Sequence, residues 1–167
     1  MKKIIMLFFI INCLAFSIPN FSNLGWGFTA DAVKGFYPEA ESEITTINDV
    51  TKYNYYPKDT DIEKITFLFV HAQLYKIISV FDLTKVHTTD VKDIFEDYSN
   101  KWGKSNPTPF EENYESFTIK GNEHTWVVDS TYISFIGEDY FDTQNNLTNS
   151  KLITEYGLID PIKINNK

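Results

Sequence analysis

The chain has little of several residue types on which whole classes of protein depend. It contains one cysteine, no arginine and only seven glycines in 167 residues. A lone cysteine cannot form an intramolecular disulfide, and no glycine-rich phosphate loop, GxSxG or SxxK motif is present. After the first 17 residues no stretch approaches the roughly 20 apolar residues that a membrane-spanning helix needs. Disulfide scaffolds, nucleotide-binding loops and common nucleophilic hydrolases are therefore disfavoured.

The N-terminus has the pattern of a secretory signal peptide. Two lysines precede an apolar run from Ile4 to Ile11, and Ala15-Phe16-Ser17 fits a small-x-small cleavage site. We predict a signal peptide over residues 1–17, cleavage near Ser17 and a secreted or periplasmic location. Cys13 raises the alternative of a lipoprotein, which is not favoured because Asn12 stands where a small residue is expected before a lipidated cysteine.

Removal of 17 residues leaves 150 residues without a thiol and lowers the formal net charge from −8 to −10. Nucleic acids and anionic membranes are bound through clusters of basic residues, often arginine, so neither is an expected partner. A chain of this size can bury a core without covalent staples. We expect one domain over residues 18–142, followed by a polar C-terminal tail over 143–167 in which Lys151 to Tyr156 is a possible edge strand.

The fold is predicted to be organised around a hairpin between Lys64 and Leu83. Two runs rich in β-branched and aromatic residues, 65–70 and 74–81, flank His71-Ala72, which we interpret as a two-residue turn. In that register Phe69 lies opposite Leu74, Ile65 opposite Ile78, Leu68 opposite Tyr75 and Thr66 opposite Ile77. Both faces of the hairpin are then largely apolar, which predicts a position in the middle of a sheet.

Two helices are expected. The first is short, with Thr29 as its expected N-cap and an apolar face of Val33, Phe36 and Tyr37. The second runs from Thr89 to Trp102, with Thr88 or Thr89 as its N-cap, and Gly103 is expected to end it.

Further strands are predicted at Asp49 to Tyr56, Glu115 to Lys120, Glu123 to Val128 and Thr131 to Gly137, with turns at 121–122 and 129–130. In that register Phe117, Trp126 and Ile133 would share one face. The halves 25–83 and 88–141 suggest a tandem α-β-β-β repeat. The expected fold class is therefore α+β, an antiparallel sheet of about six strands with two helices on one face. The expected core comprises Phe67, Phe69, Ile77, Ile94, Phe95, Tyr98 and Trp126.

Two short motifs carry a resemblance to a known group. Trp26-Gly27-Phe28-Thr29 followed by Val33-Lys34, a hairpin, and a helix closing on Lys101-Trp102-Gly103-Lys104 resemble small secreted bacterial proteins of the beta-lactamase-inhibitor-protein-like fold. That group is similar in turn to the small lipoprotein of the outer-membrane assembly machinery. The resemblance, over about residues 25 to 137, implies a binding protein or an envelope assembly factor, and no functional residue is transferred.

Candidate chemistry is sparse. His71, His87 and His124 have no metal-ligand spacing, so scattered surface histidines are the favoured interpretation and neither metal nor cofactor is expected. The acidic groups 111–115 and 138–142 leave open a hydrolase or carbohydrate-active enzyme that uses paired carboxylates. Solvated loop charge is favoured for both groups.

Aromatic residues are abundant, at 24 of the 150 mature residues. Tyr53, Tyr55 and Tyr56 crowd one strand, and with Leu68 and Tyr75 they are the candidates for a partner-binding surface on the uncovered sheet face. The alternative is that two of these tyrosines pack in the core while the third caps an edge. We expect a non-catalytic binding protein for a protein or peptide, with homo-oligomerisation as a further option.

Overall fold

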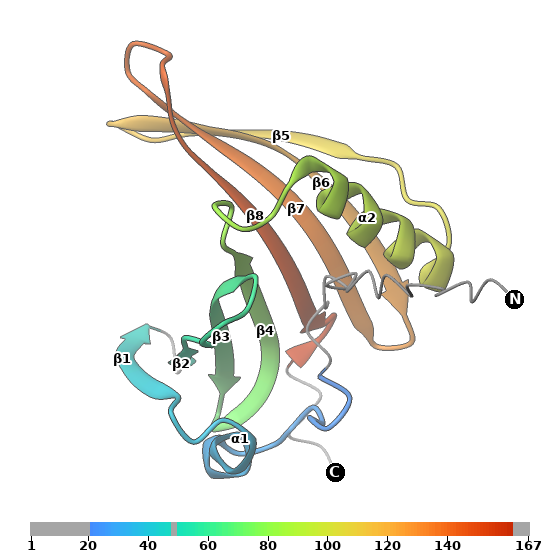
Figure 1. The fold of residues 1–167 in the computed structure, drawn as a ribbon. Helices are drawn as coiled ribbons and strands as arrows, with labels where there is room; N and C mark the ends of the chain where they lie inside the picture. Colours follow the sequence, from blue (N-terminus) through green and yellow to red (C-terminus); the bar gives the residue numbers. More distant parts are fainter. Residues whose placement is uncertain (1–20, 48–49, 162–167) are drawn as a thin grey trace, which may run out of the picture.

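The computed structural model describes residues 21–47 and 50–161, which form two helices and one eight-stranded antiparallel sheet (Figure 1). The strand order is β1-β2-β3-β4-β8-β7-β6-β5. The elements are α1 (Ala30–Phe36), β1 (Glu41–Ile47), β2 (Val50–Tyr55), β3 (Ile62–Val70), β4 (Gln73–Phe81), α2 (Thr88–Trp102), β5 (Thr108–Asn113), β6 (Phe117–Val128), β7 (Thr131–Asp142) and β8 (Leu147–Leu158).

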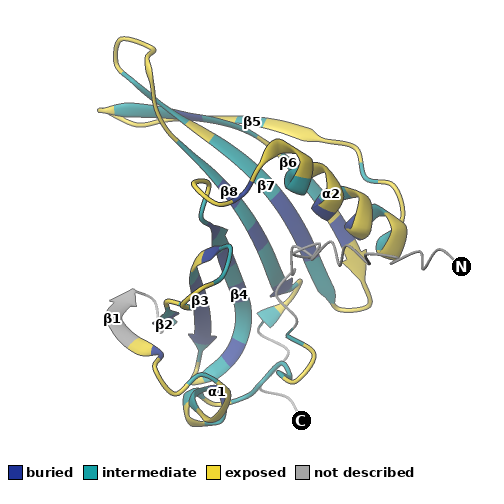
Figure 2. Cartoon of the chain, in the orientation of Figure 1, coloured by how far each residue is buried: buried dark blue, intermediate teal, exposed yellow. Residues whose placement is uncertain are grey.

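Both helices contribute to a core on the same side of the sheet, which confirms the predicted α+β class. Val33 of α1 and Ile94 and Tyr98 of α2 are each 1% exposed and belong to one apolar cluster with β3 and β4. In Figure 2 the buried stretches lie along the central strands, whereas β5 is largely exposed. Of the seven predicted core residues, six are buried, and Phe95 is half-buried with its ring against Trp126 and Phe135.

The central hairpin is confirmed, with a correction to its register. His71 and Ala72 both have positive φ, 49° and 63°, as a two-residue turn that follows the sheet twist requires. Phe69 pairs with Leu74 as predicted, but Leu68 pairs with Lys76 and Ile65 with Ser79. The chain inserts one extra residue, Tyr75, as a β-bulge, so the pairs from Leu68–Lys76 to Lys64–Val80 are displaced by one position. A second irregularity between Ile62 and Lys64 restores the predicted offset at the Ile62–Phe81 pair.

The C-terminal segment is a central strand, and its assignment as a tail with an edge strand is wrong. β8 lies between β4 and β7; it pairs with β7 along its length and with β4 from Ile153 to Gly157. Its core-facing residues, Leu152, Thr154 and Tyr156, alternate with Ile153 and Glu155 on the other face. Because Thr154 is polar and the surrounding residues are Asn, Ser, Lys and Glu, hydrophobic alternation in this strand is weak in the sequence.

The predicted turn at Gly121-Asn122 is also wrong, since β6 runs unbroken through both residues. A Cβ atom at position 121 would collide with the backbone oxygen of Gly137 and with the Phe110 ring. The glycine therefore permits close approach across the sheet, which is the other common reason for glycine within a strand. Trp126 pairs with Ile133 as expected, whereas Phe117 has the opposite alternation and does not share their face.

Both helices lie where the sequence predicts them, but the N-cap of α2 differs from the prediction. Thr29 caps α1 as predicted, its Oγ1 accepting from the Ala32 amide at 3.3 Å, but Phe36 is 52% exposed and leaves the apolar face. His87 takes the N-cap position of α2 in place of a threonine, and the Asp90 carboxylate accepts its amide at 2.7 Å. Gly103 ends α2 with φ 92°.

Each half of the chain contains one helix and four strands. The sequence-based prediction missed β1 and β5, divided β6 into two strands and placed β8 in a tail, so the predicted α-β-β-β unit is one strand short. The tandem duplication itself stays a prediction. Within the described ranges, no helix combines the length and apolarity needed to cross a membrane.

Candidate functional site

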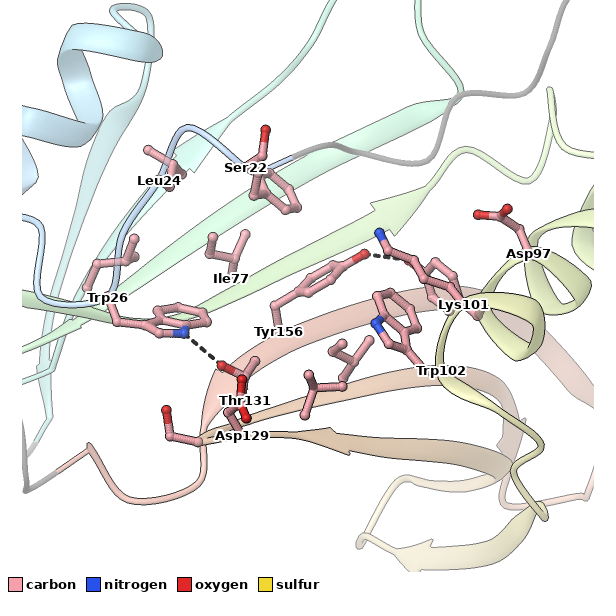
Figure 3. Close-up of a pocket in the computed structure, with 16 residues that line it drawn as sticks. Ser22, Leu24, Trp26, Ile77, Asp97, Lys101, Trp102, Asp129, Thr131 and Tyr156 are labelled. Atoms are coloured by element: carbon pink, nitrogen blue, oxygen red, sulfur yellow. Dashed lines mark hydrogen bonds between the residues drawn. The ribbon is translucent and has the colours of Figure 1, made fainter.

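A cavity of about 660 Å³ lies on the helix-covered face of the sheet (Figure 3). One wall is the segment from Phe21 to Trp26 that precedes α1, and the other is the C-terminal half of α2. The floor comes from β4, β8 and β7, and the turn between β6 and β7 closes one end. This volume lies within the range of pockets that hold small organic molecules.

The N-terminal wall is fixed to the sheet by backbone and side-chain hydrogen bonds. The amide of Gly27 donates to the Leu74 oxygen at 3.0 Å, and the Leu74 amide donates to the Phe28 oxygen at 2.8 Å. Gly27 has φ 86°, a conformation that side-chain-bearing residues rarely adopt. The indole Nε1 of Trp26 donates to Thr131 Oγ1 on β7 at 2.9 Å. Trp26 is therefore held in place as part of a formed wall.

Aromatic rings dominate the interior. Tyr156 rises from β8 in the centre of Figure 3, with Trp26 and Trp102 on opposite sides. The Phe21 ring meets Tyr156 edge to face at 5.5 Å, and Tyr98 meets Trp102 at 4.8 Å. Such rings give a ligand large apolar contact area at a low cost in side-chain entropy.

The Tyr98 and Tyr156 hydroxyls form a hydrogen bond of 2.7 Å that joins α2 to β8. Burial is the main cause that raises the pKa of Tyr98 far above its ordinary value, with contributions from Tyr156 and from the nearby Asp97 carboxylate. Burial also raises the pKa of Tyr156, although its hydrogen bond with Tyr98 acts in the opposite direction. Both phenols are therefore neutral at physiological pH, and they offer polar anchoring without charge.

Charged groups stand at the rim. Asp97 and Lys101 come from one face of α2, and Asp129 from the β6–β7 turn, where its φ is 55°. The Lys101 Nζ lies 4.8 Å from the centre of the Trp102 ring, a cation–π distance. Figure 3 places Asp97 and Asp129 at opposite sides of the cavity, and both residues are exposed. This arrangement suits recognition of polar groups at the mouth better than acid–base work by a closely spaced pair.

The five predicted partner-binding residues do not form one surface. Tyr53 and Tyr55 face the helices: Tyr53 meets Phe69 at 5.4 Å and Tyr55 meets Tyr37 at 5.2 Å. Their assignment to the uncovered face is therefore wrong, because their alternation in β2 matches that of the core residues of β3. Leu68 does lie on the uncovered face but is only 8% exposed.

The other two candidates lie apart from these. Tyr56 is exposed just beyond the end of β2, and Tyr75 is half-buried at the bulge of β4. The packing thus matches the alternative in which two of the crowded tyrosines join the core and the third stays at an edge.

The acidic clusters of the sequence lie away from the cavity, on β5 and at the far ends of β6 and β7. Glu112 accepts from the Tyr114 hydroxyl at 2.6 Å, and Asp139 from the Ser150 hydroxyl at 2.6 Å. Asp142 organises the β7–β8 turn, since its carboxylate accepts the amides of Gln144 and Asn146. Within residues 21–47 and 50–161, no three His, Cys, Asp or Glu side chains cluster as metal ligands would.

Sequence reasoning did not identify the cavity. Its residues come from one helix, four strands and the segment before α1, and Tyr156 lies in the strand that the sequence placed in a tail. Trp26 and Trp102 occur in the two quoted motifs, but nothing in their spacing indicates that they face each other across a pocket. The one usable signal was the high aromatic content.

Comparison of the chain with protein-family models, with curated proteins and with solved structures finds no match.

Proposed function

We propose that the chain is an exported, non-catalytic binding protein that holds a small amphiphilic organic molecule in the cavity beside Tyr156. The observation that carries the proposal is a formed aromatic cavity of about 660 Å³ whose polar groups lie mainly at the rim. The apolar body of the ligand packs between Trp26 and Trp102, and its polar group meets Asp97, Lys101 or Asp129. This differs from the protein or peptide partner expected from the sequence.

A fluorescence titration tests the binding site. N-phenyl-1-naphthylamine is a neutral aromatic probe that brightens in apolar surroundings, and we expect saturable binding of one molecule per chain. Val128 lines the cavity, and its neighbour Val127 points to the other face of β6 and is 64% exposed. Val128→Trp should fill the cavity and weaken binding at least tenfold, whereas Val127→Trp should not change it.

Two outcomes would reject the cavity as the binding site. One is an unmodified protein that gives no saturable signal with the probe. The other is equal affinity in the Val127→Trp and Val128→Trp variants, with both folded by circular dichroism.

Export is tested separately by the mass of the protein recovered outside the cytoplasm. The predicted signal peptide requires a chain that begins at Ile18, and a diacylglyceryl modification at Cys13 would support the lipoprotein alternative instead.

A further inference from the structure

The face of the sheet opposite both helices carries an apolar strip across its centre. Val80, Ile153 and Ile136 are paired in register on β4, β8 and β7, and Ile78 lies two residues along β4. Their neighbours in each strand, such as Ser79, Thr154 and Phe135, belong to the helix-covered face, so these four side chains project the other way. All four are half-buried rather than covered.

The charges on the inner strands of this helix-free face differ between its two halves. The lysine half comprises Lys52, Lys64 and Lys76 on β2, β3 and β4, while its edge strand β1 pairs Glu41 with Asn54 and Glu43 with Lys52. The glutamate half comprises Glu155, Glu138, Glu123 and Glu112 on β8, β7, β6 and β5.

Lys76 and Glu155 meet at the boundary between the halves, 2.6 Å apart. Burial acts to lower the pKa of Lys76, but the hydrogen bond and charge of Glu155 outweigh it and raise that pKa, so Lys76 keeps its positive charge. Lys151 is the one lysine on the glutamate side among these face positions, and its Nζ is held by the Tyr140 hydroxyl at 3.1 Å.

We propose that the helix-free face is a homodimer interface, formed by a second copy of this chain. The boundary between β4 and β8 divides the sheet into four strands on each side. A two-fold axis that runs along this boundary, in the plane of the interface, brings the lysine half of each copy over the glutamate half of the other. The same operation places the two apolar strips in contact, so the surface is complementary to itself over the six inner strands β2, β3, β4, β8, β7 and β6.

The face is large enough for a stable dimer. The six inner strands, about 4.8 Å apart, span about 24 Å, and a nine-residue strand at about 3.3 Å per residue is about 30 Å long. The resulting area of about 700 Å² is close to the roughly 800 Å² per partner of a standard interface. The interface uses the side of the sheet opposite the cavity, so the dimer leaves the proposed ligand site open.

Sedimentation velocity with paired charge reversals tests the proposal. The purified protein should sediment as a dimer at micromolar concentration. One variant carries Lys52→Glu and Lys64→Glu, and the other carries Glu123→Lys and Glu138→Lys. Each should be at least tenfold weaker in self-association, because like charges then face each other, and an equimolar mixture should form a heterodimer.

The matched control is Lys92→Glu with Glu96→Lys, which exchanges an exposed pair on α2, 3.4 Å apart, and should leave the dimer intact. A monomeric unmodified protein would overturn the proposal. Dimers that persist in both charge variants, or folded variants that stay monomeric when mixed, would also overturn it, since the contact would then lie elsewhere or involve another partner.

Discussion

Removing the Tyr98 and Tyr156 hydroxyls one at a time and together should give strongly non-additive losses of stability. The two oxygens lie 2.7 Å apart and connect the main helix to the central strand β8. Tyr156→Phe leaves the hydroxyl of Tyr98, a residue only 1% exposed, without this partner. An unpaired buried hydroxyl costs about 1–3 kcal/mol. Tyr98→Phe should cost less, about 1 kcal/mol, because Tyr156 lines the cavity and can bond to water there.

The double variant should be no less stable than Tyr156→Phe alone, because replacing both hydroxyls leaves neither phenol oxygen of this pair unpaired. The expected coupling energy is about 1 kcal/mol, in the range of residues that contact each other. Guanidinium chloride unfolding of the four proteins provides the free energies, with the denaturant slope as a check that the unfolded state is unchanged. Losses that simply add in the double variant would show that the hydroxyl pair does not stabilise the docking of α2 on β8.

Three further predictions concern packing and pH. Phe95→Ala should lower the free energy of unfolding by about 3 kcal/mol and the thermal midpoint by at least about 5 °C. The control Phe36→Ala, at an exposed position of α1, should change the free energy of unfolding by no more than about 0.5 kcal/mol. Equal midpoints in the two variants would refute the docking of α2. Gly121→Ala should lower the free energy of unfolding measured in urea. The control Gly35→Ala, whose added Cβ meets nothing within 4 Å, should raise it by about 0.5–1 kcal/mol. A Gly121→Ala variant that is more stable than Gly35→Ala would contradict the close approach in β6. The contribution of Tyr98 and Tyr156 to the free energy of unfolding should be fully present below about pH 10 and should fall as the pH rises further. The reason is that tyrosines in the unfolded chain ionise there, while the raised pKa values keep the two cavity phenols of the folded chain protonated. A thermal midpoint that does not change between about pH 9 and 11 would contradict this prediction.

The parts of the fold that the sequence predicted are those in which local patterns and tertiary packing agree. The period of Ile94, Phe95 and Tyr98 indicates one helix face, and two of these residues are fully buried. The hairpin at His71-Ala72 was found in spite of poor turn residues, because the flanking runs are strongly apolar. Where one residue is inserted, at Tyr75, the pairing along the hairpin shifts, and no local pattern marks that insertion.

Other features depend on contacts between distant segments. β8 is central because it completes the sheet between the two halves, although its own alternation is weak. Gly121 has the composition of a turn residue, but its role depends on Phe110 and Gly137 in neighbouring strands. The cavity likewise exists only after Trp26, Trp102 and Tyr156 are brought together, so composition could suggest aromatic binding but could not locate it.

The central claim, a ligand cavity between the α2 wall and the N-terminal wall, is tested most directly by fluorine NMR of protein labelled with 5-fluorotryptophan. Trp26 and Trp102 line the cavity, whereas Trp126 is 4% exposed and its indole Nε1 donates to the Gly103 oxygen at 2.7 Å. Titration with indole as a soluble aromatic probe should move the Trp26 and Trp102 signals along one saturable curve, with a much smaller change at Trp126. Trp26 and Trp102 signals that do not move, or that move no more than the Trp126 signal, would contradict the cavity as a binding site.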